Sequence, residues 1–209
     1  MVENLDKAVG RIVAAVDEGG LKQETLIVFT SDNGGEKLAR NAPLRGGKGT
    51  LWEGGIRVPA IARWPETIPA ACTSDEPIQT IDWSATILHL AGATAPEDRP
   101  LDGVNLMPVL TERESLGHRP LFFRRALDPH RNNVNPQRAV RYGAWKYIDT
   151  PDGDRFLFHL NDDPGEAQNV IDNHPKLAAR LRGMLDDWEE DVDPPLYDQR
   201  AQAFKNKNR

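Results

Sequence analysis

Two oxygen-bearing side chains stand directly after an apolar segment and could bind a metal ion. Asp32 and Asn33 follow residues 25–30, a continuous run of apolar and β-branched residues, and glycines occupy positions 34 and 35. Open α/β sheets place their ligand sites at the carboxyl ends of strands. Carboxylate and amide oxygens suit calcium or magnesium rather than zinc or copper. Because a Ser-Asp-Asn-Gly-Gly stretch also forms ordinary turns, both interpretations are open at this point.

A glycine-rich segment with three cations follows at residues 43–59. Its cations are Arg45, Lys48 and Arg57. A lysine ammonium is a mobile point charge that suits an anionic oxygen, and glycines let the backbone approach a ligand closely. The segment lacks the glycine spacing of a nucleotide-binding phosphate loop, and Gly49 stands where such a loop carries serine or threonine, which argues against nucleotide binding. Arg45 and Arg57 either contact the anion or fix the loop, for example by pairing with Glu53.

The histidines offer fewer candidates. The chain has five, and none of them forms a His-x-x-x-His pair. A structural or solvated role is expected for His89, His159 and His174. His118 and His130 lie in the segment 117–131, which could form a substrate-contacting loop, so both are kept with Arg45 as candidates for substrate contacts.

The elements that position the first candidates can be predicted from periodicity. Apolar residues at helical spacing predict a helix with one buried face that ends at Gly19-Gly20. The apolar run 25–30 is typical of a strand buried on both faces of a parallel sheet. Residues 57–63, which contain Pro59, are its expected edge neighbour. Since few other segments could supply neighbours, we expect an incomplete sheet.

The rest of the chain has a different texture. A helix is predicted at residues 83–91, with Asp82 as its N-cap and Gly92 just past its end. Four short aromatic and β-branched segments, 120–124, 138–142, 144–149 and 155–160, predict a small antiparallel sheet. A last helix begins at His174-Pro175, and its apolar stripe is expected to pack on that sheet.

Composition excludes several classes of protein. Of 209 residues, 39% are hydrophobic and 28% are charged, which is typical of an ordinary globular protein. The net charge of -6 argues against a broad nucleic-acid-binding surface. No apolar run approaches the roughly 20 residues of a membrane-spanning helix. Residues 1–7 lack the pattern of a signal peptide, and the compartment stays open.

The motifs together resemble a known family. Three segments carry the resemblance: Thr-Ser-Asp-Asn-Gly at 30–34, Leu-Arg-Gly-Gly-Lys-Gly-Thr at 44–50 and Trp-Glu-Gly-Gly-Ile-Arg-Val-Pro at 52–59. They are similar to the C-terminal part of the catalytic domain of formylglycine-dependent, arylsulfatase-like sulfatases of the alkaline phosphatase superfamily. The similarity continues through residues 82–92, 101–106, 141–147 and 157–166, so it covers the chain to about residue 188.

The resemblance implies roles for three residues. Asp32 and Asn33 would bind the single calcium or magnesium ion, and Lys48 would hold a sulfate oxygen and assist departure of the alcohol as a catalytic residue. The family also implies a formylglycine nucleophile, made from a Cys/Ser-x-Pro/Ala-x-Arg motif. That motif does not occur here, because Cys72 is followed by Thr-Ser-Asp-Glu and no serine has the required spacing. We therefore expect this chain alone to be inactive and to bind metal weakly.

The resulting prediction is an α/β protein with two parts and a tail. Residues 1–110 would be the C-terminal part of a sulfatase catalytic domain, an incomplete mixed sheet with flanking helices. Residues 111–193 would form a small antiparallel sheet with a C-terminal helix, and residues 194–209 a polar tail. The expected partners are a sulfate ester in the full-length protein, and the missing N-terminal segment or a second copy of the chain. No nucleic acid or membrane partner is expected.

Two alternatives stay open. One is phosphoester hydrolysis within the same superfamily, whose members use two metals and additional histidine ligands. The other is a noncatalytic binding module, in which an uncovered apolar sheet edge would serve for association.

Overall fold

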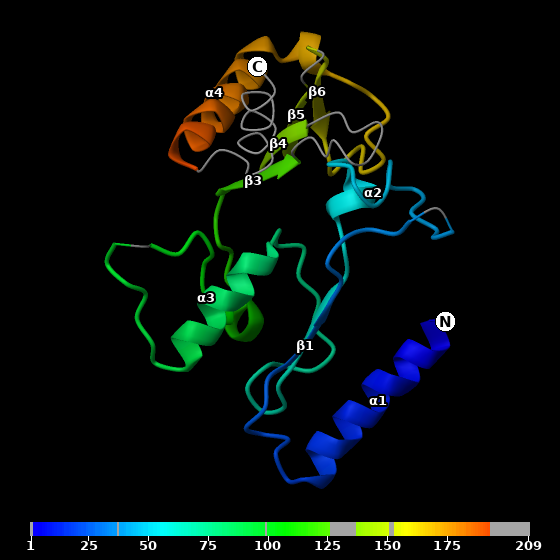
Figure 1. Ribbon diagram of the computed structural model, residues 1–209, viewed down its shortest axis with the longest axis vertical. Helices are drawn as coiled ribbons and strands as arrows, with labels where there is room; N and C mark the ends of the chain where they lie inside the picture. The colour runs from blue at the N-terminus through cyan, green and yellow to red at the C-terminus, as the bar shows by residue number, and fades with distance from the viewer. Residues whose placement is uncertain (1, 37, 99, 126–136, 151–152, 193–209) are drawn as a thin grey trace, which may run out of the picture. The chain divides into compact units, whose positions relative to one another are not determined.

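The computed structural model describes residues 2–36, 38–98, 100–125, 137–150 and 153–192 (Figure 1). It divides into two compact units, each made of two stretches of chain. Unit 1 contains Met1–Ser31 and Pro59–Leu116, and unit 2 contains Asp32–Val58 and Gly117–Arg209. Within the described ranges, no helix is both long and apolar enough to cross a membrane.

Unit 1 begins with helix α1, Val2–Glu18, which confirms the first predicted helix. The predicted burial of its apolar face is wrong at Leu5 and Ile12. Leu5 is 51% exposed and Ile12 is 59% exposed, while Val9 and Val13 are half-buried. The reason is that no described element of unit 1 covers this part of the stripe, so the helix carries an amphipathic pattern without a complete partner surface.

Strand β1, Ile27–Thr30, pairs with β2, Ala60–Arg63. The expected neighbour is confirmed, but the pairing is antiparallel, with Ile27 opposite Arg63 and Thr30 opposite Ala60. All four β1 residues are half-buried rather than fully buried. The segment between the two strands is closed near its ends by a hydrogen bond from Gly34 N to Gly55 O (2.9 Å). The start of β2 therefore lies beside the end of β1, as antiparallel pairing requires.

Helix α3, Thr80–Leu90, begins three residues earlier than predicted. Its N-cap is Gln79, and the expected cap Asp82 is instead the third helical residue. The Asp82 carboxylate accepts a hydrogen bond from Gln79 N (2.7 Å), which completes a capping box, and another from Val104 N (3.0 Å). Gly92 follows the helix with a φ of +63°, as expected of a glycine just past a helix end. A π-helical turn, Pro108–Glu112, follows this helix in unit 1.

Unit 2 is built on a four-stranded antiparallel sheet in the order β3-β4-β5-β6. Its strands are Pro120–Arg125, Gln137–Tyr142, Trp145–Asp149 and Arg155–His159. Each pairs with the next along the chain, and Gly143 (φ +60°) turns β4 into β5. The predicted small antiparallel sheet is therefore confirmed.

Both faces of this sheet are covered (Figure 1). On one face, Val140, Tyr147 and Leu157 pack against Leu181 and Leu185 of helix α4, Pro175–Asp191. A short 3-10 turn, Ile171–Asn173, precedes that helix. The expected packing of the last helix on the sheet is confirmed.

The opposite face of the sheet is covered by the glycine-rich segment. Ala139, Ile148 and Phe158 pack there against Leu51, and Trp52 lies beside them. The short helix α2, Glu53–Ile56, continues from that point. The segment that carries the candidate anion site thus belongs to the same compact unit as the C-terminal sheet. The predicted division near residue 110 stays a prediction, and the predicted tail, 194–209, lies outside the described residues.

Candidate functional site

Backbone hydrogen bonds bring the two candidate loops together inside unit 2. Lys48 N donates to Gly35 O (3.0 Å), and Gly34 N donates to Gly55 O (2.9 Å). The Asn41 side chain donates from Nδ2 to Gly35 O (2.9 Å) and to Gly46 O (3.0 Å). Residues 34–35, directly after Asp32 and Asn33, are therefore tied at three points to the segment that carries Lys48.

The glycines allow this crossing because the backbones touch. A Cβ atom on Gly34 would lie 1.8 Å from Gly54 O, and one on Gly47 would lie 2.6 Å from Gly35 O. Neither position leaves room for a side chain. The sequence suggested close approach of this backbone to a ligand, whereas here the glycines permit close approach of the two loops to each other.

Asp32 and Asn33 stand where the chain leaves β1. Asp32 is exposed and Asn33 is half-buried. Their carboxylate and amide oxygens fit a calcium or magnesium ion in donor type, but calcium takes about 6 to 8 oxygen ligands. The described residues contain no group of three or more His, Cys, Asp or Glu side chains that could hold a metal ion. The binding of a metal ion by Asp32 and Asn33 stays a prediction.

Lys48 lies on an exposed part of the glycine-rich loop. Its neighbour Gly49 has a φ of +83°, and a Cβ atom there would lie 3.6 Å from Nη2 of Arg125 at the end of β3. Gln137, opposite Arg125 in the sheet, accepts a hydrogen bond from Leu51 N through Oε1 (3.0 Å). The ends of β3 and β4 thus border the loop of the candidate lysine.

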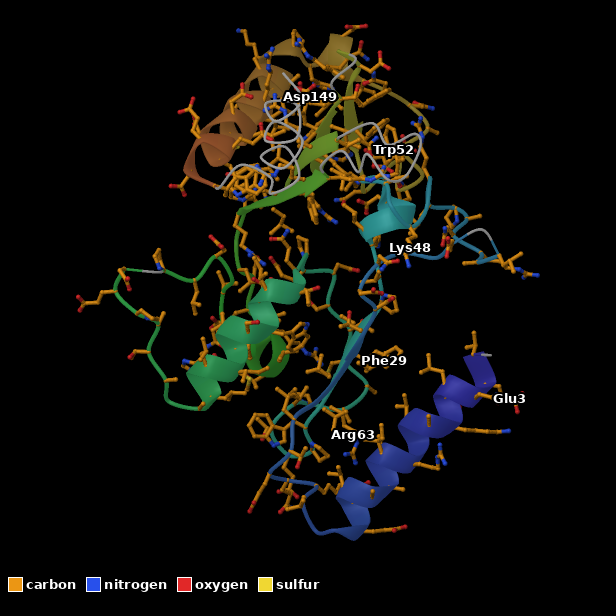
Figure 2. All side chains as sticks on the ribbon, viewed as in Figure 1. Glu3, Phe29, Lys48, Trp52, Arg63 and Asp149 are labelled. Atoms are coloured by element: carbon orange, nitrogen blue, oxygen red, sulfur yellow. The ribbon has the colours of Figure 1, made fainter. Side chains whose placement is uncertain are left out.

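Arg45 is held by contacts on unit 2. Its guanidinium lies 3.7 Å from the centroid of the Trp52 ring, and Nη1 donates to Glu166 O (3.1 Å). Figure 2 shows Trp52 on the side of α2 that faces the sheet and Lys48 on the other side. These contacts give Arg45 a loop-fixing role, and its contact with substrate stays a prediction.

Three fully buried ionisable side chains lie beneath this loop. Lys146 Nζ lies 2.8 Å from Glu53 Oε1 and 2.8 Å from Glu166 Oε1, and all three residues are at most 2% exposed. The Glu53 N–H donates to Glu166 Oε2 (2.7 Å). Two further cations approach Glu53 Oε2, Arg57 at 3.9 Å and Arg141 at 4.0 Å, which is longer than a hydrogen bond. We call Glu53, Lys146 and Glu166 the buried triad.

Burial dominates the electrostatics of this cluster. It raises the pKa of Glu166, although the Lys146 ammonium and the hydrogen bond from Glu53 N act in the opposite direction. Burial likewise lowers the pKa of Arg141, against the attraction of Glu53.

The candidate histidines lie apart from this cluster or outside the described residues. The His118 ring packs edge-on against Tyr142 (5.6 Å between centroids), beside the turn at Gly143. His130 lies outside the described residues. His159 contacts Asp162, and His159 and His174 both pack against Trp145. The roles of His118 and His130 in substrate binding stay predictions.

Sequence reasoning assigned no role to the buried triad as a unit. Glu166 directly follows Pro-Gly, a position typical of a turn residue, and Lys146 lies among strand residues. One indication was available for Lys146, because strand alternation puts it on the same face as Ile148. The neighbouring Asp163 has a local role, because its carboxylate accepts hydrogen bonds from Ala167 N and Gln168 N.

Comparison with known proteins defines the class. The sulfatase family model matches residues 1–93. The crystal structure of Ps i-CgsB in complex with k-i-k-neocarrahexaose superposes with a TM-score of 0.85 at 32% identity, covering 94% of this chain and 43% of that one. The fold is that of the alkaline-phosphatase-like sulfatases.

The curated relatives point to the same family. Mouse (Mus musculus) steryl-sulfatase is 38% identical over 193 residues, which are 85% of this chain and 28% of that protein. Bovine (Bos taurus) arylsulfatase A is 35% identical over 198 residues, which are 83% of this chain and 39% of that protein. This chain belongs to the sulfatase family. It spans less than half the length of these relatives.

Proposed function

We propose that this chain supplies part of the active site of a sulfuric ester hydrolase. Asp32 and Asn33 would be two ligands of a calcium or magnesium ion, and Lys48 would bind a sulfate oxygen. The observation that carries the proposal is the hydrogen bond from Lys48 N to Gly35 O (3.0 Å), which holds the lysine loop against the residues that directly follow Asp32 and Asn33.

The chemistry follows from charge. Hydrolysis of a sulfate ester moves negative charge among the sulfuryl oxygens and onto the departing alcohol, and a preorganised cation lowers the barrier by stabilising it. The Lys48 ammonium would supply one such charge from a loop held by backbone hydrogen bonds. A bound divalent cation would add Lewis-acid stabilisation of a sulfuryl oxygen. The named relatives differ in the rest of the substrate, so the proposal is confined to the sulfate ester.

Binding by the chain itself tests the assignment of the residues. We expect calcium, at about millimolar concentration because two protein ligands are few, to shift the amide resonances of residues 32–35. Inorganic sulfate should shift those of residues 47–50. Asp32→Asn should abolish the calcium response and Lys48→Ala the sulfate response. If each variant keeps the response of the unmodified chain, the residue assignment is wrong.

Activity is tested in a chimera. The matching stretch of bovine arylsulfatase A, 39% of that protein, is replaced by this chain. We expect the folded chimera to hydrolyse an aryl sulfate and Lys48→Ala to reduce kcat by about 100-fold or more. A folded, active chimera that is indifferent to Lys48→Ala would refute the proposed role of the lysine.

We also propose that the isolated chain does not hydrolyse aryl sulfates, even with calcium, because its sequence has no formylglycine precursor motif. Turnover that persists through purification and disappears in Lys48→Ala would contradict this. A preference of the chimera for an aryl phosphate over the sulfate would favour the phosphoesterase alternative.

A further inference from the structure

Burial of the triad costs desolvation free energy, because charged groups lose their contact with water. Two carboxylates and one ammonium are removed from water, with Glu53 2% exposed and Lys146 and Glu166 both 0% exposed. Desolvation of such groups often cancels their mutual attraction, and well-packed apolar residues of the same volume stabilise as well or better. Stabilisation of the fold alone therefore does not account for the buried triad, and the segments that it holds in place point to a further role.

One arm of the triad leads to the candidate metal ligands. Glu53 is the first residue of α2, and its side chain is held by Lys146 from the centre of the sheet. The next residues of α2 complete the connection, because Gly55 O accepts the hydrogen bond from Gly34 N (2.9 Å). Gly34 directly follows Asn33, so the position of α2 sets the position of the ligand loop.

A second arm leads to Lys48. Gly54 N donates to Arg45 O (2.7 Å), while the Arg45 side chain donates to Glu166 O (3.1 Å). The loop that begins at Arg45 is therefore attached at both backbone and side chain to the elements that the triad joins. Three residues later, Lys48 N donates to Gly35 O, which connects this loop directly to the residues that follow Asp32 and Asn33.

Glu166 itself has an unfavourable backbone conformation. Its φ of +54° falls in the left-handed region, which residues with a side chain rarely adopt. Such conformations persist where the surroundings determine them, and they concentrate at functional sites. Here the surroundings are the ammonium of Lys146, the N–H of Glu53 and the guanidinium of Arg45.

We propose that Glu53, Lys146 and Glu166 are positioning residues that fix Lys48 and the Asp32–Asn33 loop relative to each other from the centre of the C-terminal sheet. This inference rests on the proposed function for the roles of the residues so positioned. The sheet then acts as the platform of the active-site loops, and the triad is the link between them. Outer groups that orient the residues touching a ligand typically change affinity or activity by about 10- to 100-fold when removed.

The test uses the whole chain with a matched control. Lys146→Met keeps most of the side-chain volume and removes the buried ammonium. The control is Arg138→Met, which removes a cation from the opposite face of the same sheet. Arg138 there pairs with Asp149 of the sheet (2.9 Å) and with Asp186 (2.7 Å) and Glu189 (2.8 Å) of α4.

Two readouts separate positioning from stability. In Lys146→Met, we expect amide hydrogen exchange to accelerate about tenfold or more within residues 32–57, while β4, β5 and α4 exchange as they do in Arg138→Met. The affinity of the chain for inorganic sulfate should fall about tenfold in Lys146→Met and stay unchanged in Arg138→Met. Lys146→Arg, which keeps the charge, should recover part of both losses.

Uniform acceleration of exchange across unit 2, or equal effects of Lys146→Met and Arg138→Met, would overturn the proposal and leave the triad a purely structural feature. If Lys146→Met does not fold, Glu166→Gln replaces it, because the amide keeps an acceptor for Glu53 N. The exchange readout requires no ligand. If Lys48→Ala leaves sulfate binding unchanged, the proposed function fails, while the exchange pattern still decides whether the triad positions the loops.

Discussion

Replacement of Gly34 by alanine should separate the two candidate loops. A Cβ atom at this position would lie 1.8 Å from Gly54 O, whereas real Cβ atoms essentially never lie closer than 3.0 Å to another heavy atom. The obstacle is backbone of α2, so no side chain can rotate away. Forced overpacking costs about 1–3 kcal/mol, and loss of the hydrogen bond from Gly34 N to Gly55 O (2.9 Å) costs about 1 kcal/mol more. We expect Gly34→Ala to lower the free energy of unfolding of the loop region by about 3 kcal/mol.

The assay combines urea unfolding, followed by circular dichroism, with hydrogen exchange of residues 32–58. Exchange is needed because the crossing can open locally while the sheet and α4 stay folded. Gly183→Ala is the control, since a Cβ atom there meets nothing within 4 Å and alanine is the better helix former within α4 by about 1 kcal/mol. If the free energies from both measurements agree within about 0.5 kcal/mol between Gly34→Ala and the unmodified chain, the inferred close contact between Gly34 and α2 is wrong.

Three further predictions concern the rest of the molecule. Burial raises the pKa of Tyr147 to about 12, whereas the pKa of an unfolded tyrosine is about 10. The free energy of unfolding therefore falls as the pH rises from about 10 through 12, because the unfolded chain loses the phenol proton first. Tyr147→Phe should resist alkaline unfolding better than the unmodified chain in urea titrations near pH 11. Leu181→Ala should lower the free energy of unfolding by about 2–5 kcal/mol in the same assay, because this side chain is 0% exposed between α4 and the sheet. The exposed apolar side chains of α1 should drive self-association. The double variant Leu5→Glu, Ile12→Glu should therefore elute later in size-exclusion chromatography, as a monomer, without a lower melting temperature. Unchanged elution would contradict this.

Several elements could be predicted because their determinants are local. The four strands of the small sheet, the turn at Gly143 and helices α1 and α4 all follow from alternation, helical spacing or a helix-breaking residue within a few positions. Asp82 shows how such reasoning fails at boundaries. It is a suitable N-cap by residue type, but the helix begins earlier, and the same carboxylate completes a capping box with Gln79.

At the candidate site, too, the features set by local motifs could be predicted and those set by tertiary contacts could not. Asp32, Asn33 and Lys48 could be singled out from residue type and motif spacing, because short contiguous segments carry that pattern. The antiparallel pairing of β1 with β2 could not, because an apolar run shows that a strand is buried and not which strand lies beside it. The half-buried state of β1 was unpredictable for the same reason.

The sequence by itself determined the types and places of most helices and strands, the acidic composition, and the motifs that assign the chain to the sulfatase family. Only the tertiary structure decided what holds those motifs. It places the glycine-rich segment on the C-terminal sheet and joins Lys146 to Glu53 across 93 residues, Glu53 to Glu166 across 113 and Arg45 to Glu166 across 121. Contacts over such separations leave no periodic pattern along the chain, because each partner satisfies only the rules of its own strand, turn or loop. The charges of the buried triad become compatible with burial only when the fold brings them together.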